Sequence, residues 1–213
     1  MMIQRISLLV LTCIALAGCE TAYYSAMEKV GLHKRDILVD RVEDVRDSQV
    51  DVKEQFSSAL ERFTVELNFD GGELEKVYKT LDEEYQDSLS RAEDLSANID
   101  KVEDVAADLF EEWEQELDQY SNASLKRQSA RQLRETKAHY KKMLSAMHSA
   151  ENKMFPVLET LHDQVLFLKH NLNARAIASL KGEFGTLKRD IQRLIADMEK
   201  SIKASESFME TLQ

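Results

Sequence analysis

The chain has 213 residues, a formal net charge of −11 at pH 7 and 43% hydrophobic residues, which is enough apolar material for a packed core. This composition excludes an intrinsically disordered chain. A single proline and six glycines leave few places where a helix must stop, so long helices and no strands are expected. The acidic balance also argues against nucleic acid as a partner.

The first 18 residues have the pattern of a secretory signal peptide. Arg5 supplies the positive charge near the start, and the apolar run 6–17 is too short to remain in a bilayer as a spanning helix. The run ends in Leu-Ala-Gly-Cys at 16–19, which matches the lipobox of bacterial lipoproteins. We therefore expect cleavage after residue 18 and lipidation of the Cys19 thiol.

Lipidation of Cys19 sets the expected location and limits how the fold is stabilised. Each methylene of an acyl chain that enters the bilayer contributes about 0.8 kcal/mol to the free energy of membrane binding. Several acyl chains therefore hold a protein on a membrane more firmly than one chain does. Glu20 follows, whereas retention in the inner membrane mainly requires aspartate there, so the outer membrane is expected, with the protein facing the periplasm. Cys13 leaves with the signal, so the mature chain 19–213 has no free thiol and relies on packing.

Stripes of apolar residues at steps of three and four predict an all-α fold. We expect one domain, an elongated, antiparallel, coiled-coil-like bundle of three or four long helices. The first helix is expected at about 24–67, and the pair Gly71-Gly72 then turns the chain. Its stripe is Leu38, Val42, Val45, Val52, Phe56, Ala59, Phe63 and Leu67, with Gln49 in the one polar slot.

The second and third helices are expected at about 73–120 and 124–172, separated by the capping residues 121–124. Pro156 in the third predicts a kink or a short break, because proline removes an internal hydrogen bond. The second stripe is Leu74, Val77, Leu81, Tyr85, Leu89, Ala92, Leu95, Ile99, Val102, Ala106, Leu109, Trp113, Leu117 and Tyr120. The third is Leu133, Thr136, Tyr140, Met143, Met147, Ala150, Met154, Val157, Leu161, Val165, Leu168 and Leu172.

A fourth helix is expected at about 174–212, and its stripe slips in phase against the third between Leu172 and Ile177. Either the chain reverses there to give a four-helix bundle, or one very long helix runs past a three-helix body. We favour the reversal, because an unpaired terminal helix leaves its apolar stripe in water. The fourth stripe is Ile177, Leu180, Phe184, Leu187, Ile191, Leu194, Met198, Ile202, Phe208 and Leu212.

Charge is unevenly distributed between the two middle helices. Residues 73–120 hold 17 acidic and four basic side chains, whereas residues 124–172 hold four acidic and nine basic ones. Opposite charge favours the two as antiparallel neighbours. The basic run of the third helix is either a solvated or salt-bridged face opposite the second helix, which we favour, or a site for an anionic partner. The run is Lys126, Arg127, Arg131, Arg134, Lys137, Lys141 and Lys142.

The sequence offers little that resembles an active site. Glu159 and His162 form one Glu-x-x-His, whereas di-iron sites in helical bundles need two copies and two further glutamates, so ordinary surface residues are expected. No phosphate-binding loop, nucleophile elbow or clustered ligand set occurs. We expect a protein that is not an enzyme and that needs no metal or cofactor.

Four segments resemble an uncharacterised bacterial family of envelope proteins, the domain of unknown function 2959. They are the lipobox, the Val-x-x-Val-rich first helix, the Phe-Asp-Gly-Gly turn at 69–72 and, above all, Leu-Phe-Leu-Lys-His-Asn-Leu-Asn-Ala-Arg-Ala-Ile at 166–177. The resemblance covers nearly the whole mature chain and implies no activity, ligand or catalytic residue. In the last segment His170, Asn171 and Asn173 form one candidate site, which caps a turn or binds a partner; capping is favoured.

The expected function is that of a non-enzymatic scaffold of the bacterial envelope, held on the membrane through the lipid on Cys19. Its long charged faces would contact an envelope protein or another copy of the chain. The alternative is a carrier that binds an apolar ligand between kinked helices near Pro156. Such a carrier needs an internal cavity lined by Met143, Met147, Met154 and Leu161.

Overall fold

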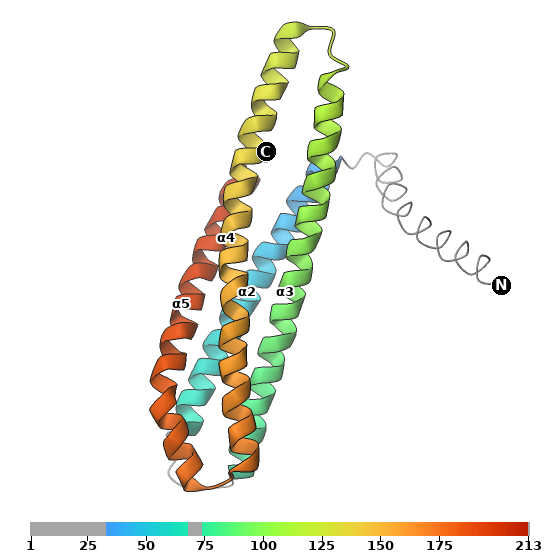
Figure 1. Ribbon diagram of the computed structural model, residues 1–213. Coiled ribbons are helices and arrows are strands. Elements are labelled where there is room, and N and C mark those ends of the chain that lie inside the picture. The colour runs from blue at the N-terminus through green and yellow to red at the C-terminus, as the bar shows by residue number, and fades with distance from the viewer. Residues whose placement is uncertain (1–32, 68–73, 213) are drawn as a thin grey trace, which may run out of the picture.

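The computed structural model describes residues 33–67 and 74–212, which form four long helices and no strand. The helices are α2 (Lys34–Leu67), α3 (Leu74–Leu117), α4 (Ala123–His170) and α5 (Ala174–Leu212). Consecutive helices run antiparallel and pack against each other, and α5 also packs against α2, which closes a four-helix bundle (Figure 1). The predicted elongated all-α bundle is confirmed, with four helices because the chain reverses after α4.

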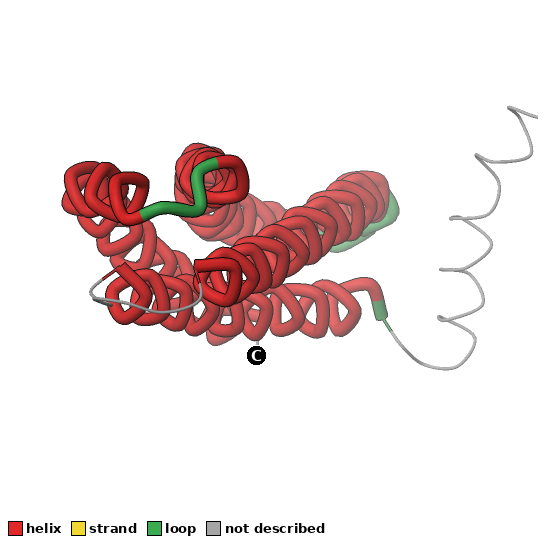
Figure 2. The backbone as a smooth tube through the Cα atoms, turned by 90° about the horizontal axis from the view of Figure 1, so that it is seen from below, coloured by secondary structure: helices red, strands yellow, loops and turns green. Residues whose placement is uncertain are grey.

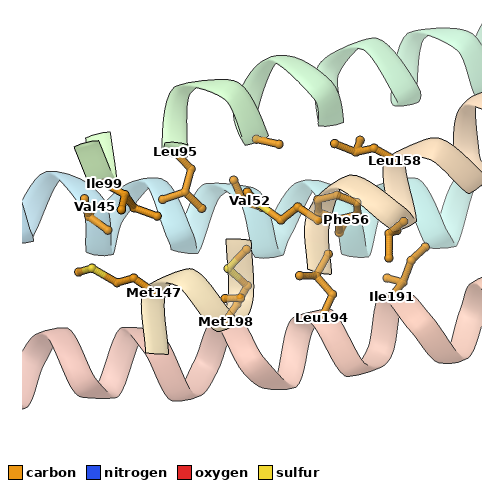
Figure 3. Close-up of a cluster of buried hydrophobic side chains, with 14 of the residues drawn as sticks. Val45, Val52, Phe56, Leu95, Ile99, Met147, Leu158, Ile191, Leu194 and Met198 are labelled. Carbon is orange, nitrogen blue, oxygen red and sulfur yellow. The ribbon is translucent and has the colours of Figure 1, made fainter. Parts of the chain in front are cut away.

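The core is built from the predicted apolar stripes. Every position of the first stripe, from Leu38 to Leu67, is buried in α2, and so is Gln49. The four helices contribute to one shared cluster, part of which is drawn in Figure 3. Figure 2 shows the backbone of the bundle from below. Side chains labelled in Figure 3 are Val45, Val52 and Phe56 of α2, Leu95 and Ile99 of α3, Met147 and Leu158 of α4, and Ile191, Leu194 and Met198 of α5. Each fully buried large apolar side chain contributes about 1.5–3 kcal/mol relative to its exposed state.

The one polar slot of the first stripe is matched by polar residues of α5. Gln49 is fully buried and its Nε2 donates to Ser201 Oγ at 2.7 Å, while Ser205 Oγ donates to the Ser201 carbonyl oxygen at 3.1 Å. The sequence assignment placed Ile202 in the seam, whereas the steps of three and four run through Ser201 and Ser205, which are both buried. Serine is counted as a surface residue in a hydrophobicity pattern, so the polar layer was missed.

The helix ends differ from the predictions by a few residues. The predicted start of the first helix, residues 24–32, lies outside the described residues. α3 ends at Leu117, so Tyr120 lies in the following turn and is 41% exposed. α4 ends at His170, and Leu172 is 44% exposed although it was assigned to the core. In both cases the chain leaves the helix before the last apolar residue of the stripe.

Pro156 does not break α4, which runs unbroken from Ala123 to His170. The predicted short break is therefore wrong. A proline costs the helix one internal hydrogen bond, and neighbouring contacts in the bundle offset that cost. Met154, Val157 and Leu158 are buried on both sides of the proline, so the core packing continues across it.

α3 and α4 are longer than α2 and α5 and project beyond them as a two-helix extension (Figure 1). The start of α2 and the end of α5 reach only the level of Trp113 on α3 and Thr136 on α4, since these elements line one common hollow. From Thr136 to Ala123 the extension measures about 20 Å at 1.5 Å per residue. The bundle thus has a four-helix body, with the two-helix extension at one end and the α4–α5 turn at the other.

Candidate interaction surfaces

The α4–α5 turn is held by the asparagines that the sequence singled out. The Asn171 backbone N–H donates to the Leu168 carbonyl at 3.1 Å, and its Nδ2 donates to the Phe167 carbonyl at 2.9 Å, which caps α4. Asn173 Oδ1 accepts the Ala176 backbone N–H at 3.1 Å and caps α5. Both asparagines therefore have the capping role. The His170 side chain is exposed and has no hydrogen bond or ion pair with the described residues.

The same turn carries large apolar side chains on its surface. Leu166, Phe167 and Leu172 are 42%, 41% and 44% exposed. Lys169 and Arg175 are exposed beside them in the sequence. We call these five residues the α4–α5 end. The sequence analysis favoured capping for this segment, and the two asparagines cap the helices, whereas the exposure of their apolar neighbours was not predicted.

A hollow of about 690 Å³ lies where the two-helix extension leaves the body. Lys34 of α2 spans it to Glu112 of α3, with 2.9 Å between Nζ and Oε2. Trp113 lines the hollow, and its Nε1 donates to Ser129 Oγ of α4 at 2.8 Å. The hollow is open to solvent and lined by both polar and apolar groups, as expected where a four-helix core ends.

The acidic and basic helices are neighbours, as predicted, and ion pairs join them. Lys126 contacts Asp118 at 3.0 Å and Lys137 contacts Glu114 at 2.6 Å, both in the extension. The other cations of the basic run are exposed and form no ion pair with any described residue: Arg127, Arg131, Arg134, Lys141 and Lys142. The basic run is thus salt-bridged at two positions, and its other five members form a solvated basic face on α4.

His148 is a titratable contact between α3 and α4 that sequence analysis did not identify. Its Nδ1 lies 2.8 Å from Glu151 Oε2, and its Nε2 lies 3.3 Å from Glu103 Oε1 of α3. The hydrogen bond with Glu151 and the weaker one with Glu103 raise the pKa of His148 above its usual value. The signal was present in the sequence as the i, i+3 spacing of His148 and Glu151, but Glu103 is brought near only by the fold.

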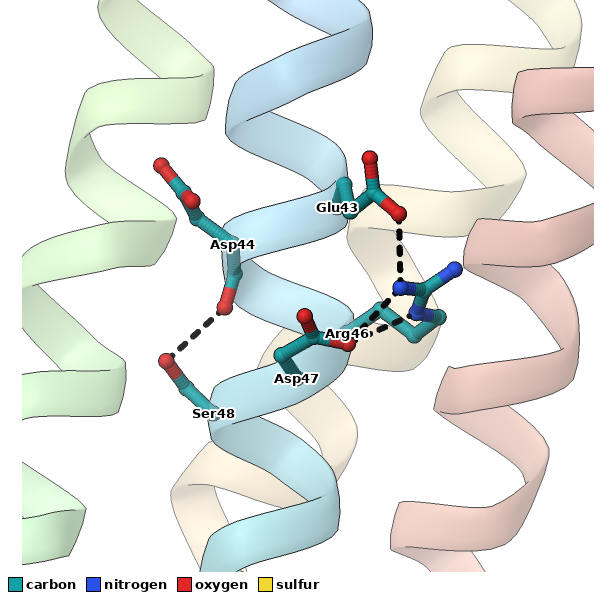
Figure 4. A network of polar contacts seen from close by, with 5 residues as sticks. All are labelled: Glu43, Asp44, Arg46, Asp47 and Ser48. Atoms are coloured by element: carbon teal, nitrogen blue, oxygen red, sulfur yellow. Dashed lines mark hydrogen bonds and ion pairs between the residues drawn. The ribbon is translucent and has the colours of Figure 1, made fainter.

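The exposed side of α2 is held by polar contacts along the helix (Figure 4). Arg46 binds the carboxylates of Asp47 and Glu43, each at 2.8 Å, and these contacts, with Asp47 first, raise its pKa. Ser48 Oγ donates to the Asp44 carbonyl at 2.8 Å. Ser48 Oγ also accepts a hydrogen bond from Asn98 Nδ2 of α3 at 2.8 Å, so these contacts stabilise α2 and join it to α3.

The Glu159–His162 pair has a structural explanation. The His162 ring packs on Tyr85 of α3 with 5.1 Å between ring centroids. In residues 33–67 and 74–212 no three His, Cys, Asp or Glu side chains gather in a way that would hold a metal ion. His162 therefore contributes surface packing between α3 and α4, and Glu159 is exposed. Cys19, the predicted lipidation site, lies outside the described residues.

The residues proposed to line a ligand cavity form part of the packed core. Met143, Met147, Met154 and Leu161 are at most 1% exposed. The hollow at the base of the extension and a second one over Asp87 and Asn98 are lined by other residues. No observation on these four side chains favours the carrier hypothesis.

These features define a structural class for the described residues, an all-helical bundle of four long helices around one packed core. The chain belongs to the family described as Protein of unknown function (DUF2959), whose model matches residues 23–212. No curated protein and no solved structure matches the chain. Among the helices of the described residues, none is long and apolar enough to cross a membrane.

Proposed function

We propose that the protein is a lipid-anchored, non-enzymatic scaffold of the bacterial envelope that faces the periplasm and presents a rigid rod to an envelope protein or to another copy of itself. The observation that carries this proposal is the contrast between interior and surface. Large apolar side chains from all four helices fill the core, while the acidic α3 and the basic face of α4 expose charges of opposite sign. Such a rod offers long surfaces of opposite charge to a partner.

The anchor is proposed from the lipobox that ends at Cys19. His33, the first described residue, lies 14 positions after Cys19, so the connecting chain spans at most about 50 Å. A connection of this length would keep the start of α2 within about 50 Å of the bilayer. Glu20 supports the outer membrane as the location.

The two charged faces support a protein partner. Arg131 and Arg134 of α4 are exposed and carry no ion pair with a described residue, and on α3 the same holds for Asp100 and Asp104. Exposed charges of one sign steer a complementary partner and fix its register, and they contribute more to association rate and specificity than to affinity. A partner that contacts both faces must itself carry a basic and an acidic surface. A second copy of the chain meets this condition.

In-cell crosslinking tests the proposal. A photoreactive residue replaces Asp104 on the acidic face or Arg131 on the basic face, and the captured proteins are identified by mass spectrometry. The proposal predicts a defined envelope protein or the chain itself, with capture lost when Cys19→Ser removes the anchor. The matched control carries the photoreactive residue at Ser57, an exposed position of α2 outside both faces. Equal capture from all three positions, or capture unaffected by Cys19→Ser, would contradict the scaffold.

A further inference from the structure

The α4–α5 end combines exposed apolar side chains with cations and lies at the opposite end of the rod from the two-helix extension (Figure 1). Leu166, Phe167 and Leu172 are each more than two-fifths exposed. They lie at the end of α4 and in the α4–α5 turn, whereas the two hollows described above are lined by other residues. Exposed apolar side chains at the end of a rod can enter a fluid apolar phase without a matching shape. A folded protein partner would need a complementary hollow.

Within the turn segment itself the charge has one sign, although the whole chain carries −11 and the exposed carboxylates of Asp163 and Glu183 flank the segment. Between Gln164 and Gly182 the sequence has three cations, Lys169, Arg175 and Lys181, and no carboxylate. All three cations are exposed and form no ion pair with a described residue. The basic character is confined to α4 and α5.

The neighbouring helices bring carboxylates to the same end of the bundle. Glu66 lies in the last turn of α2 and Glu75 in the first turn of α3, where Glu75 pairs with Lys79 at 2.8 Å. These acidic groups belong to the other helix pair, so the end has a basic, apolar half and a mixed half. An anionic surface is therefore attracted to the half of this end that α4 and α5 form.

The turn is already ordered, which lowers the cost of docking. Asn171 and Asn173 cap the two helices, and Leu168 and Ala176 are buried beneath them. The exposed apolar side chains are therefore held on a fixed backbone, and little conformational freedom is lost when they are covered.

We propose that the α4–α5 end docks on an anionic bilayer surface, with Leu166, Phe167 and Leu172 in the interfacial region and Lys169 and Arg175 at the headgroup phosphates. Apolar side chains flanked by Lys and Arg are the combination with which proteins hold on to an anionic membrane surface. This contact goes beyond the lipid anchor, since it requires no acyl chain on Cys19.

Vesicle binding of the lipid-free chain tests the contact directly. The chain from residue 20 to 213, which keeps every described helix, is mixed with vesicles of phosphatidylethanolamine and phosphatidylglycerol at 3:1, or with phosphatidylcholine vesicles. We expect binding at least about tenfold stronger to the anionic vesicles at low salt, with a loss as salt rises. No binding, or equal binding to both vesicles, would overturn the proposal without touching lipidation of Cys19, which is measured separately by mass.

Two double variants distinguish binding through the α4–α5 end from non-specific binding to vesicles. Leu166→Ser combined with Phe167→Ser, and Lys169→Glu combined with Arg175→Glu, are each expected to lower anionic vesicle binding about tenfold or more. The controls are Tyr120→Ser with Leu125→Ser, which removes exposed apolar groups at the opposite end, and Lys141→Glu with Lys142→Glu, which reverses the same number of charges on α4. Equal losses in test and control variants would overturn the assignment to this end.

A fluorescence measurement keeps the test independent of any folding defect in these variants. The chain has one tryptophan, Trp113, in the extension. In a Trp113→Phe background, Phe167→Trp is expected to shift its emission to the blue on anionic vesicles and to be quenched by brominated lipids. In the wild type, Trp113 is expected to show neither change. An unshifted Trp at 167 with vesicles bound would contradict insertion of this end.

Discussion

The four-helix body and the two-helix extension are made partly of the same helices, yet their interiors differ. In the body, α2 and α5 cover the seam between α3 and α4, and residues such as Phe56 and Leu95 are fully buried. In the extension neither α2 nor α5 covers that seam. Leu117 is only partly buried there, and Leu125 is 51% exposed.

The difference shows how one pattern of apolar residues gives two kinds of structure. A stripe of apolar residues at steps of three and four is fully buried only where two further helices cover it. Elsewhere the same stripe forms the line of contact between two paired helices. At the base of the extension, polar contacts add to this line: Lys137 pairs with Glu114 and also lies 5.3 Å from the centre of the Phe110 ring. We expect hydrophobic burial to dominate the stability of the body and local contacts to hold the extension.

The largest expected effect comes from emptying the body core. Phe56 is 0% exposed, and Phe56→Ala is expected to lower the free energy of unfolding by about 3–5 kcal/mol, since it removes a large buried side chain and leaves a cavity. Leu125→Ala in the extension is expected to change it by less than about 0.5 kcal/mol. Urea unfolding followed by circular dichroism measures both. Similar losses in the two variants would erase the distinction between body and extension.

A smaller effect is expected at the buried polar layer of the body. Gln49→Ala leaves Ser201 without its side-chain donor, and we expect a loss of about 1–3 kcal/mol in the free energy of unfolding. The double change Gln49→Leu with Ser201→Ala removes both polar groups and is expected to cost less than Gln49→Ala alone. The same urea titration compares the variants. A larger loss of unfolding free energy in the double variant than in Gln49→Ala would contradict this explanation. It would mean that the polar layer stabilises the fold by more than one hydrogen bond.

In the extension, Trp113→Phe is expected to act locally and to cost about 1 kcal/mol. The change removes the hydrogen bond to Ser129, which is 7% exposed, but keeps an aromatic ring in the seam. Amide hydrogen exchange should become faster in the extension, residues 112–133, and stay unchanged around Phe56. Uniformly faster exchange along the whole rod would show that body and extension unfold as one unit.

The smallest expected effect is a pH dependence at His148, which is 38% exposed and therefore well screened by solvent. Its pKa is raised in the folded state, so its contribution to stability is complete below the unfolded value of about 6.5 and is lost as pH rises through the folded value. His148→Gln should flatten the fall in stability over that window. The midpoint of urea unfolding, measured from pH 5 to 8, reports the difference. An unchanged pH profile would show that the contacts of His148 with Glu151 and Glu103 do not stabilise the packing of α4 on α3.

The sequence predicted those elements of the fold that depend on long, regular burial. The first stripe was complete, and the reversal near Leu172 followed from the argument that a lone amphipathic helix is unstable in water. The errors lie where burial ends or where polar residues enter the core. Tyr120 and Leu172 continue their stripes in sequence but lie beyond the last turn of the helix, and Ser201 is buried because Gln49 faces it.

The candidate surfaces were predicted only in outline. The opposite charges of α3 and α4 were visible in composition, and the asparagines at 171 and 173 indicated a capped turn. Neither the contact of His148 with Glu103 nor the exposure of Phe167 was foreseen. Both depend on which residues of different helices come to the same level, and a single sequence does not specify that register.

The most direct test of the account is the mass of the protein extracted from the envelope of its own cells. A lipid-anchored scaffold predicts a mature chain that begins at Cys19 and carries acyl chains, in the membrane fraction, while Cys19→Ser gives an unprocessed chain without acylation. A mature chain that begins elsewhere, or an unmodified thiol at Cys19, would contradict the anchor and with it the proposed role at the membrane.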